Sequence, residues 1–149
     1  MLRLLVALDF SDCSRDALRA ALSVVEHVTP SEIVMLTVLE PLDDEAAQSE
    51  SALNEMERAV SALHEMLEAM VKERRLGKLP KGTKLHYTTA RGAPAERIIE
   101  AASAHHVDGI VMGTHGRTGF NRLIAGSVAE LVVRNAPCSV LTVKPKKTA

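Results

Sequence analysis

The feature that most constrains the fold is a series of short, almost continuous apolar runs separated by segments with helical periodicity. Residues 2–10 (LRLLVALDF) form the first run, and similar runs occupy residues 32–40, 107–113 and 138–143. A strand reads as continuously apolar when both faces of its sheet are covered, which is typical of parallel sheets. The sequence therefore predicts a parallel sheet that is buried on both sides.

The segments between these runs complete the alternation of strands and helices. Helices are expected at residues 13–28, from Asp43 or Asp44 to about residue 76, at 93–106 and at 127–135, with Val28, Leu53 and Leu131 among their inward-facing residues. A further strand, residues 84–90, alternates in polarity and is expected nearer the margin of the sheet. This order predicts one α/β domain over residues 1–149, with right-handed crossovers.

Composition narrows the classes of function. Aromatic residues make up 2% of the chain and tryptophan is absent, so the stacking platforms of single-stranded nucleic acid binding are not expected. The net charge of −1 offers no field that attracts nucleic acid or an anionic membrane. Cys13 and Cys138 have no metal-type spacing, and no apolar run is long enough to span a membrane. We expect a cytoplasmic protein with neither nucleic acid nor membrane as a partner.

The candidate site lies between the fourth strand and the last helix. Gly113 and Gly116 follow the strand, and Gly126 and Ser127 precede the helix. Glycine lets backbone amides approach an anion, and a helix N-terminus favours phosphate. The pattern therefore indicates an anion cradle, although the same glycines could simply permit turns. Neither a P-loop nor a GxGxxG motif after the first strand is present.

The spacing Gly113-x2-Gly116-x9-Gly126-Ser127 resembles the G-x2-G-x9-G-[S/T] motif of the ATP-binding branch of the universal stress protein family. The start of the chain, LLVALDFSDCSRDAL, and its end, VMGTHGRTGFNRLIAGSVAELVVRNAPCSVLTV, also resemble that family. The resemblance implies a five-stranded parallel sheet of order 3-2-1-4-5, adenine nucleotide alpha hydrolase-like, with helices on both faces. It also implies ATP at the carboxyl edge and homodimers formed through residues 138–143.

The resemblance further implies a set of binding residues. Asp9 would lie near the ribose and adenine, with Val38 lining the adenine. Loop contacts would come from Met112, Gly113, His115 and Gly116, and phosphate contacts from Gly126, Ser127 and Val128. Ala7 stands where some members carry proline, and it completes the candidate set.

Several alternatives remain open at this stage. Asp9 could be a helix-initiating carboxylate, and His115 could contribute its backbone rather than its imidazole. The function implied by the resemblance is that of a regulatory nucleotide-binding homodimer in the stress response, with ATP alone or with Mg²⁺. The alternatives are a slow ATP hydrolase or phosphoryl transferase, and an interaction module that does not use nucleotide. No catalytic nucleophile or P-loop lysine is evident.

Overall fold

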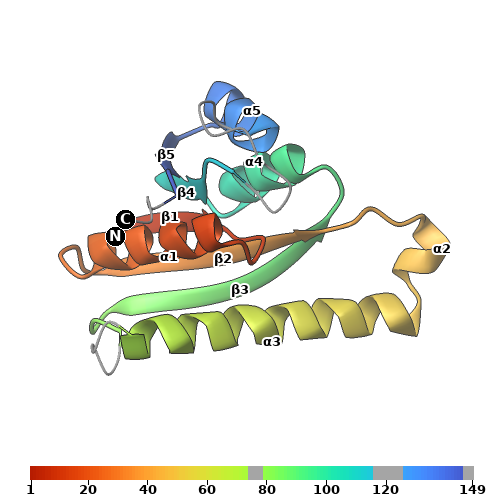
Figure 1. Cartoon of the computed structure of the whole chain (residues 1–149), viewed down its shortest axis with the longest axis horizontal. Coiled ribbons are helices and arrows are strands. Elements are labelled where there is room, and N and C mark those ends of the chain that lie inside the picture. Colours follow the sequence, from red (N-terminus) through yellow and green to blue (C-terminus); the bar gives the residue numbers. More distant parts are fainter. Residues whose placement is uncertain (74–78, 116–125, 146–149) are drawn as a thin grey trace.

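The computed structural model describes residues 1–73, 79–115 and 126–145. Its centre is a five-stranded parallel sheet with the order β3-β2-β1-β4-β5, which confirms the expected topology (Figure 1). The strands are β1 (Leu2–Ala7), β2 (Ser31–Leu39), β3 (Thr83–Arg91), β4 (Gly109–Gly113) and β5 (Ser139–Val143). β3 and β5 are the two edge strands, as expected for the margin position of residues 84–90.

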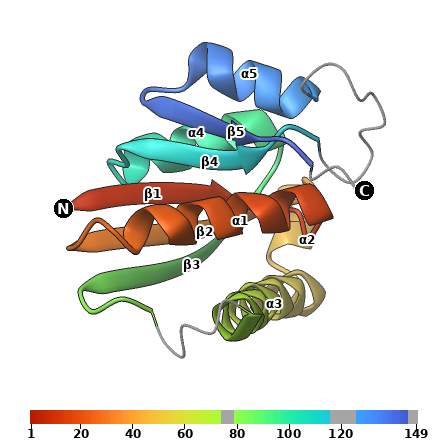
Figure 2. The same cartoon turned by 60° about the vertical axis from the view of Figure 1, so that its left-hand side comes forward.

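Helices cover both faces of the sheet. They are α1 (Asp12–Val25), α2 (Asp44–Ala47), α3 (Glu50–Glu73), α4 (Pro94–Ala104) and α5 (Ser127–Asn135). The core on one face is formed with α1 and α3, and the core on the other with α4 and α5 (Figure 2). Right-handed crossovers produce this division, because the chain runs from β1 to β3 in one direction and from β4 to β5 in the other.

Each face has its own aliphatic core. The first contains Leu4, Val6, Leu18, Leu22, Ile33, Met35, Leu63, Leu67, Met70 and Val111. The second contains Leu5, Val34, Leu36, Ile98, Val107, Ile110, Met112, Ala129 and Val132. Adjacent residues of β1 and β2 alternate between the two cores, as the two-residue period of a strand requires. Within the described residues, no helix is long and apolar enough to cross a membrane.

The single long helix expected from Asp43 or Asp44 to residue 76 is wrong at its start. Ser49 separates α2 from α3: its hydroxyl donates to the Ala46 carbonyl at 2.6 Å and accepts from the Ala52 amide at 3.1 Å. A hydroxyl that caps the following helix competes with a continuous helical ladder. Asp43 caps α2 in the same manner, through the Ala46 amide at 2.7 Å. The expected end near residue 76 lies outside the described residues.

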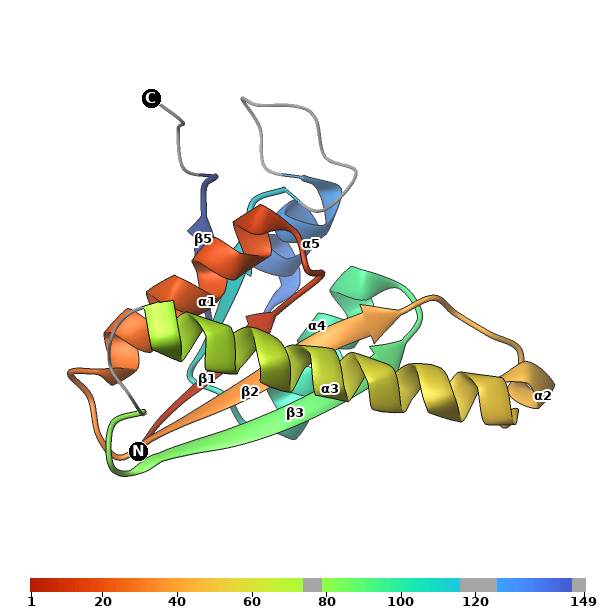
Figure 3. The same cartoon turned by 60° about the horizontal axis from the view of Figure 1, so that its bottom comes forward.

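Three residues expected to face inward are exposed. Val28 lies beyond the end of α1, which finishes at Val25. On α5 the buried residues are Ala129 and Val132, so Leu131 points away from the core and is 47% exposed. Leu53 is 52% exposed because the first turns of α3 project beyond the sheet (Figure 3). Periodicity identified these helical segments, but the buried face that it predicted for each helix included residues that are exposed.

Arg91, at the end of β3, holds the projecting segment to the sheet. Its guanidinium donates to the carbonyls of Glu40 and Ala52, each at 3.1 Å, and pairs with the Glu55 carboxylate at 2.9 Å. Further along α3, the His64 ring meets the edge of Tyr87 on β3 with 5.4 Å between the ring centroids. Both contacts tie α3 to the same edge strand.

Replacing Arg91 by methionine keeps the aliphatic stem but removes the donors to Glu40 and Ala52. We expect a loss of about 1–2 kcal/mol in the free energy of unfolding, measured by urea denaturation, since the guanidinium is mostly buried. The matched variant Glu55→Gln should lower the free energy of unfolding by less than about 1 kcal/mol. The Glu55 side chain is half-exposed, and this substitution removes only the ion pair. Equal losses in the two variants would show that the carbonyl bonds contribute nothing.

Candidate functional site

The switch point of the sheet lies between β1 and β4. The chain leaving β1 passes to α1 on one face, and the chain leaving β4 leads to α5 on the other. In open α/β sheets, ligands bind outside the carboxyl ends of the strands at such a point. Asp9 follows β1 and Thr114 follows β4, so both connections belong to the expected ligand-binding edge.

Asp9 is held by the turn that starts α1. The Ser11 amide donates to Asp9 Oδ1 at 3.0 Å, and the Ser11 hydroxyl donates to the same oxygen. Ser11 itself is the N-cap of α1, because its hydroxyl accepts from the Ser14 amide. Asp9 therefore orients the capping residue rather than capping the helix directly. Between them, Phe10 has a φ of 65°, a left-handed conformation that is uncommon for a bulky residue.

Four of the expected binding residues share one face of the sheet. Ala7 on β1, Val38 on β2 and Val128 on α5 are half-buried against the core formed with α4 and α5, and Met112 on β4 belongs to that core. Ala7 and Val38 come from adjacent strands, since Ala7 is in register with Leu36. The structure therefore brings apolar side chains from three strands and α5 into a single cluster at the carboxyl half of the sheet.

Gly113 is required by packing against α1. A Cβ built on Gly113 would lie 2.7 Å from Cys13 Sγ, 3.0 Å from the Cys13 carbonyl carbon and 3.1 Å from Cys13 Cβ. The 2.7 Å separation requires something to shift and the other two are tight, so a larger residue would strain the contact between the start of α1 and β4. The geometry gives Gly113 a helix-packing role in addition to any contact with an anion.

The two ends of the glycine-rich connection meet through backbone hydrogen bonds. The Gly126 amide donates to the Thr114 carbonyl at 2.5 Å, and the Thr114 amide donates to the Val143 carbonyl at 3.0 Å. A Cβ on Gly126 would lie 3.0 Å from the Thr114 carbonyl oxygen, a tight contact that favours a small residue there. The Gly126 amide is thus already engaged by the protein. Gly116 lies outside the described residues.

Gly126 is the N-cap of α5, and Ser127 is the first residue of the helix. Among the side chains that the structure describes, none caps this helix start with a hydrogen bond, and Ser127 is exposed. The positive end of the α5 dipole and its first amides are suited to an anion. The amides that could hold phosphate are therefore those that follow Gly126, rather than the Gly126 amide itself.

Thr114 is a site residue that the sequence did not reveal. Its buried hydroxyl lies 2.9 Å from His115 Nδ1 and 4.0 Å from Cys13 Sγ. The Cys13 thiol in turn donates to the Val143 carbonyl at 3.1 Å. Thr114 thus connects the imidazole of His115 to the contact between α1 and β4. Its only sequence signal is its position directly after a buried strand.

The two cysteines lie at opposite edges of the sheet, Cys13 beside the end of β4 and Cys138 just before the start of β5. Cys13 is buried and Cys138 is half-buried, and both are free. Burial raises the pKa of the Cys138 thiol, and the nearby Asp108 carboxylate raises it further. In the part of the chain that the structure describes, no group of three histidine, cysteine or acidic side chains is placed to hold a metal ion.

Comparison with known proteins agrees with this architecture. Residues 1–144 match the model of the universal stress protein family. Universal stress protein MJ0531 of Methanocaldococcus jannaschii is 33% identical over 146 residues, covering 97% of this chain and 84% of that protein. The solved structure of MJ0577, from the same organism, is 29% identical with a TM-score of 0.72, covering 99% and 98% of the two chains. A universal stress protein of Arabidopsis thaliana, solved with AMP bound, shares the fold at 21% identity and a TM-score of 0.60, covering 98% and 93%.

The parallel sheet, covered by helices on both faces, defines a doubly wound α/β protein. Together with the match over residues 1–144, this fold assigns the chain to a family: it belongs to the universal stress proteins.

The contact between Gly113 and Cys13 predicts a specific rescue. Gly113→Ala should lower the free energy of unfolding by about 1–3 kcal/mol through overpacking. Cys13→Ala removes the nearest clashing atom, so the double variant should lose less stability than the sum of the two single variants. The measurement is a double-mutant cycle by chemical denaturation. Strictly additive losses would contradict the proposed steric contact.

Proposed function

We propose that this chain binds an adenine nucleotide at the carboxyl edge of the sheet and acts as a regulatory nucleotide-binding homodimer. One observation carries the proposal: the carboxylate of Asp9, the apolar side chains of Ala7, Val38 and Met112, and the start of α5 all belong to the switch-point edge. An apolar surface, a fixed carboxylate and a helix N-terminus match the three parts of a nucleotide: base, ribose and phosphates.

The base and the ribose would bind on the side of β1 and β2. Adenine is flat and apolar on its faces, and Ala7 and Val38 offer half-buried aliphatic surface from neighbouring strands. The Asp9 carboxylate is an acceptor for ribose hydroxyls, and its Oδ1 is oriented by two bonds from Ser11. Holding the carboxylate in place before binding lowers the entropy lost on binding.

The phosphates would bind at the start of α5. Its first amides and the Ser127 hydroxyl are donors at the positive end of a helix dipole. The contact between Gly126 and Thr114 fixes where this helix begins relative to β4. His115, Gly116 and Val128 would complete the contacts. Binding of AMP by the Arabidopsis relative shows that this fold can accommodate an adenine nucleotide.

The triphosphate form is the proposed ligand, and Mg²⁺ could arrive with it. Melting temperatures should rise with ATP in the wild type, by the equivalent of about 2.7 kcal/mol at a hundredfold excess over Kd. Ser127→Asp should abolish most of the ATP shift, because it places a negative charge where the phosphates would bind. An acid there also suits the helix start, so the fold should be retained.

Ser127→Asn is the matched control, since it has nearly the same shape without the charge and should keep most of the shift. Adenosine, which lacks phosphates, should bind both variants equally. A wild type that ATP does not stabilise, with or without Mg²⁺, would overturn the proposal. Phosphate release over hours from the same samples distinguishes a nucleotide-holding regulator from a slow hydrolase.

The homodimer would form through β5. This edge strand is flanked by exposed apolar side chains: Leu141 on the strand itself, and Leu131 and Val133 on α5. An unpaired apolar edge invites strand pairing unless it is covered. A second copy that pairs with residues 138–143 would cover both the backbone edge and these side chains. The role in stress physiology is proposed from family membership.

Leu141→Lys should convert a dimer into a monomer, because it places a charge in the centre of the proposed interface. Sedimentation at micromolar concentration measures the change. Leu53→Lys is a matched control, since Leu53 is similarly exposed but lies on the projecting part of α3. A wild type that sediments as a monomer would rule out the dimer, and a Leu141→Lys variant that stays dimeric would rule out this interface.

A further inference from the structure

The segment from the end of β2 to the middle of α3 differs in charge from the rest of the molecule. Residues 40–68, here called the acidic arm, contain one basic residue, Arg58, and nine acidic residues: Glu40, Asp43, Asp44, Glu45, Glu50, Glu55, Glu57, Glu65 and Glu68. The whole chain has 19 acidic and 18 basic residues, so the remainder is net positive. Charge is therefore segregated along the chain rather than mixed.

Ion pairs within the described residues neutralise only a small part of the negative charge of the acidic arm. Glu55 pairs with Arg91 and Glu68 with His64, but the other seven acidic side chains have no ion-pair partner among the described residues. Acidic residues in the first turns of α2 and α3 suit the helix dipoles, which explains Asp44, Glu45 and Glu50. The dipole effect does not extend to Glu57 and Glu65, which lie beyond the first two turns of α3.

The acidic arm also presents apolar surface. Leu42 is 42% exposed and Leu53 is 52% exposed. Leu53, Met56 and Val60 are spaced by three and four residues, so they form one stripe along α3. Before Leu63 the only buried residues of α3 are Ala52 and Ala59, and from Leu63 on the larger side chains of the helix enter the core shared with α1. Figure 1 shows α2 and the first turns of α3 extending past the strands.

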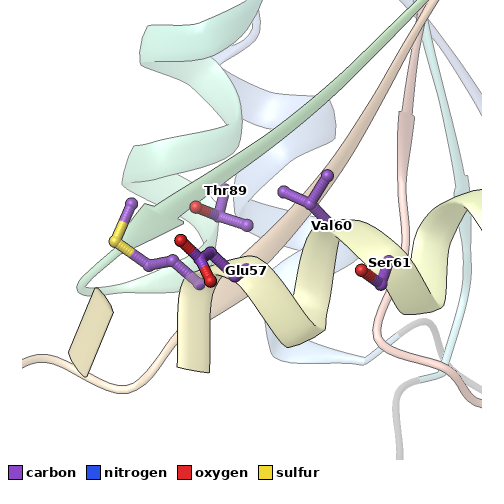
Figure 4. A pocket seen from close by; sticks show the side chains of 5 residues that line it. Glu57, Val60, Ser61 and Thr89 are labelled. Atoms are coloured by element: carbon purple, nitrogen blue, oxygen red, sulfur yellow. The ribbon is translucent and has the colours of Figure 1, made fainter. Parts of the chain in front are cut away.

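An open groove of about 550 Å³ adjoins this stripe, and Met56, Glu57, Val60, Ser61 and Thr89 line it. Figure 4 shows the side chains of Glu57 and Thr89 in the space between α3 and β3, with Val60 beside them. The groove thus combines aliphatic walls with a carboxylate. It lies on the face of the sheet opposite to the proposed nucleotide contacts of Ala7 and Val38.

We propose that the acidic arm and its groove form a docking surface for a basic amphipathic helical segment of a partner protein. Apolar side chains on such a segment would pack on Leu53, Met56 and Val60, as in helix-in-groove recognition. Its lysine or arginine side chains would face the seven carboxylates that have no ion-pair partner within residues 1–73, 79–115 and 126–145. Charge complementarity selects this partner chemistry. An acidic helix would make the apolar contact but be repelled by the carboxylates. A neutral helix would remove water from the carboxylates without replacing it by opposite charge. This site is independent of nucleotide binding.

The test uses a fluorescent peptide of about 18 residues, five helical turns, with leucine on one face and lysine on the other. We expect saturable one-to-one binding to the full-length chain by fluorescence anisotropy, weakening as salt rises from about 50 to about 300 mM. The same peptide with glutamate in place of lysine should not bind. Absence of saturable binding of the lysine peptide would overturn the proposal.

A pair of matched double variants separates the groove from long-range charge. Leu53→Gln with Glu57→Lys should weaken peptide binding by about tenfold or more, whereas Val28→Gln with Glu96→Lys should change it less than about twofold. Both pairs alter one exposed apolar residue and one exposed acid, with the same change in net charge. Thermal melting followed by circular dichroism verifies that both fold.

Two further outcomes would contradict the assignment. Equal weakening in the two double variants would mean that the peptide senses only overall charge. If sedimentation showed that Leu53→Gln with Glu57→Lys reduces self-association of the wild type, the occupant of the groove would be a second copy of this chain instead of a basic partner.

Discussion

The contact between Cys13 and Gly113 is the constraint on which the candidate site depends. Because Gly113 has no side chain, the first turn of α1 packs directly on the end of β4. This approach sets the position of Asp9 and Ser11, which precede α1, relative to Thr114 and His115, which follow β4. The Cys13 thiol extends the arrangement to β5 through its hydrogen bond to Val143. One close approach therefore aligns three of the five strands at their carboxyl ends.

The sequence predicted the sheet, the strand order implied by the family and the position of the last helix. The sheet and the last helix were predictable because a strand covered on both faces is a continuous apolar run and an amphipathic helix has a visible period, whereas the strand order came from the family resemblance. The break between α2 and α3 was missed because it depends on the hydrogen bonds of the Ser49 hydroxyl, which caps α3 and so interrupts the helix. Leu131 was misplaced because the narrow contact of α5 needs only Ala129 and Val132.

At the candidate site, the binding residues named from the sequence stay predictions, and the structure adds packing contacts among them. The glycines were interpreted as an anion cradle, which stays a prediction; the structure adds that Gly113 and Gly126 also lie close to Cys13 and Thr114. Contacts between residues about a hundred positions apart, such as Cys13 with Thr114, depend on the strand order and leave no local pattern. Ser11 likewise has the pattern of an ordinary helix cap, and only the structure reveals that Ser11 and Asp9 hold each other in place.

The pairing of His64 with Tyr87 gives the molecule an internal optical reporter. Tyr87 is the only tyrosine in a chain without tryptophan, so its emission dominates the intrinsic fluorescence. Its ring lies where α3 meets the edge strand, and burial raises the pKa of its hydroxyl, as does the Glu68 carboxylate. The ultraviolet signal of the unlabelled protein will therefore report detachment of α3 from the sheet. The same signal will change little when a ligand binds beside Asp9.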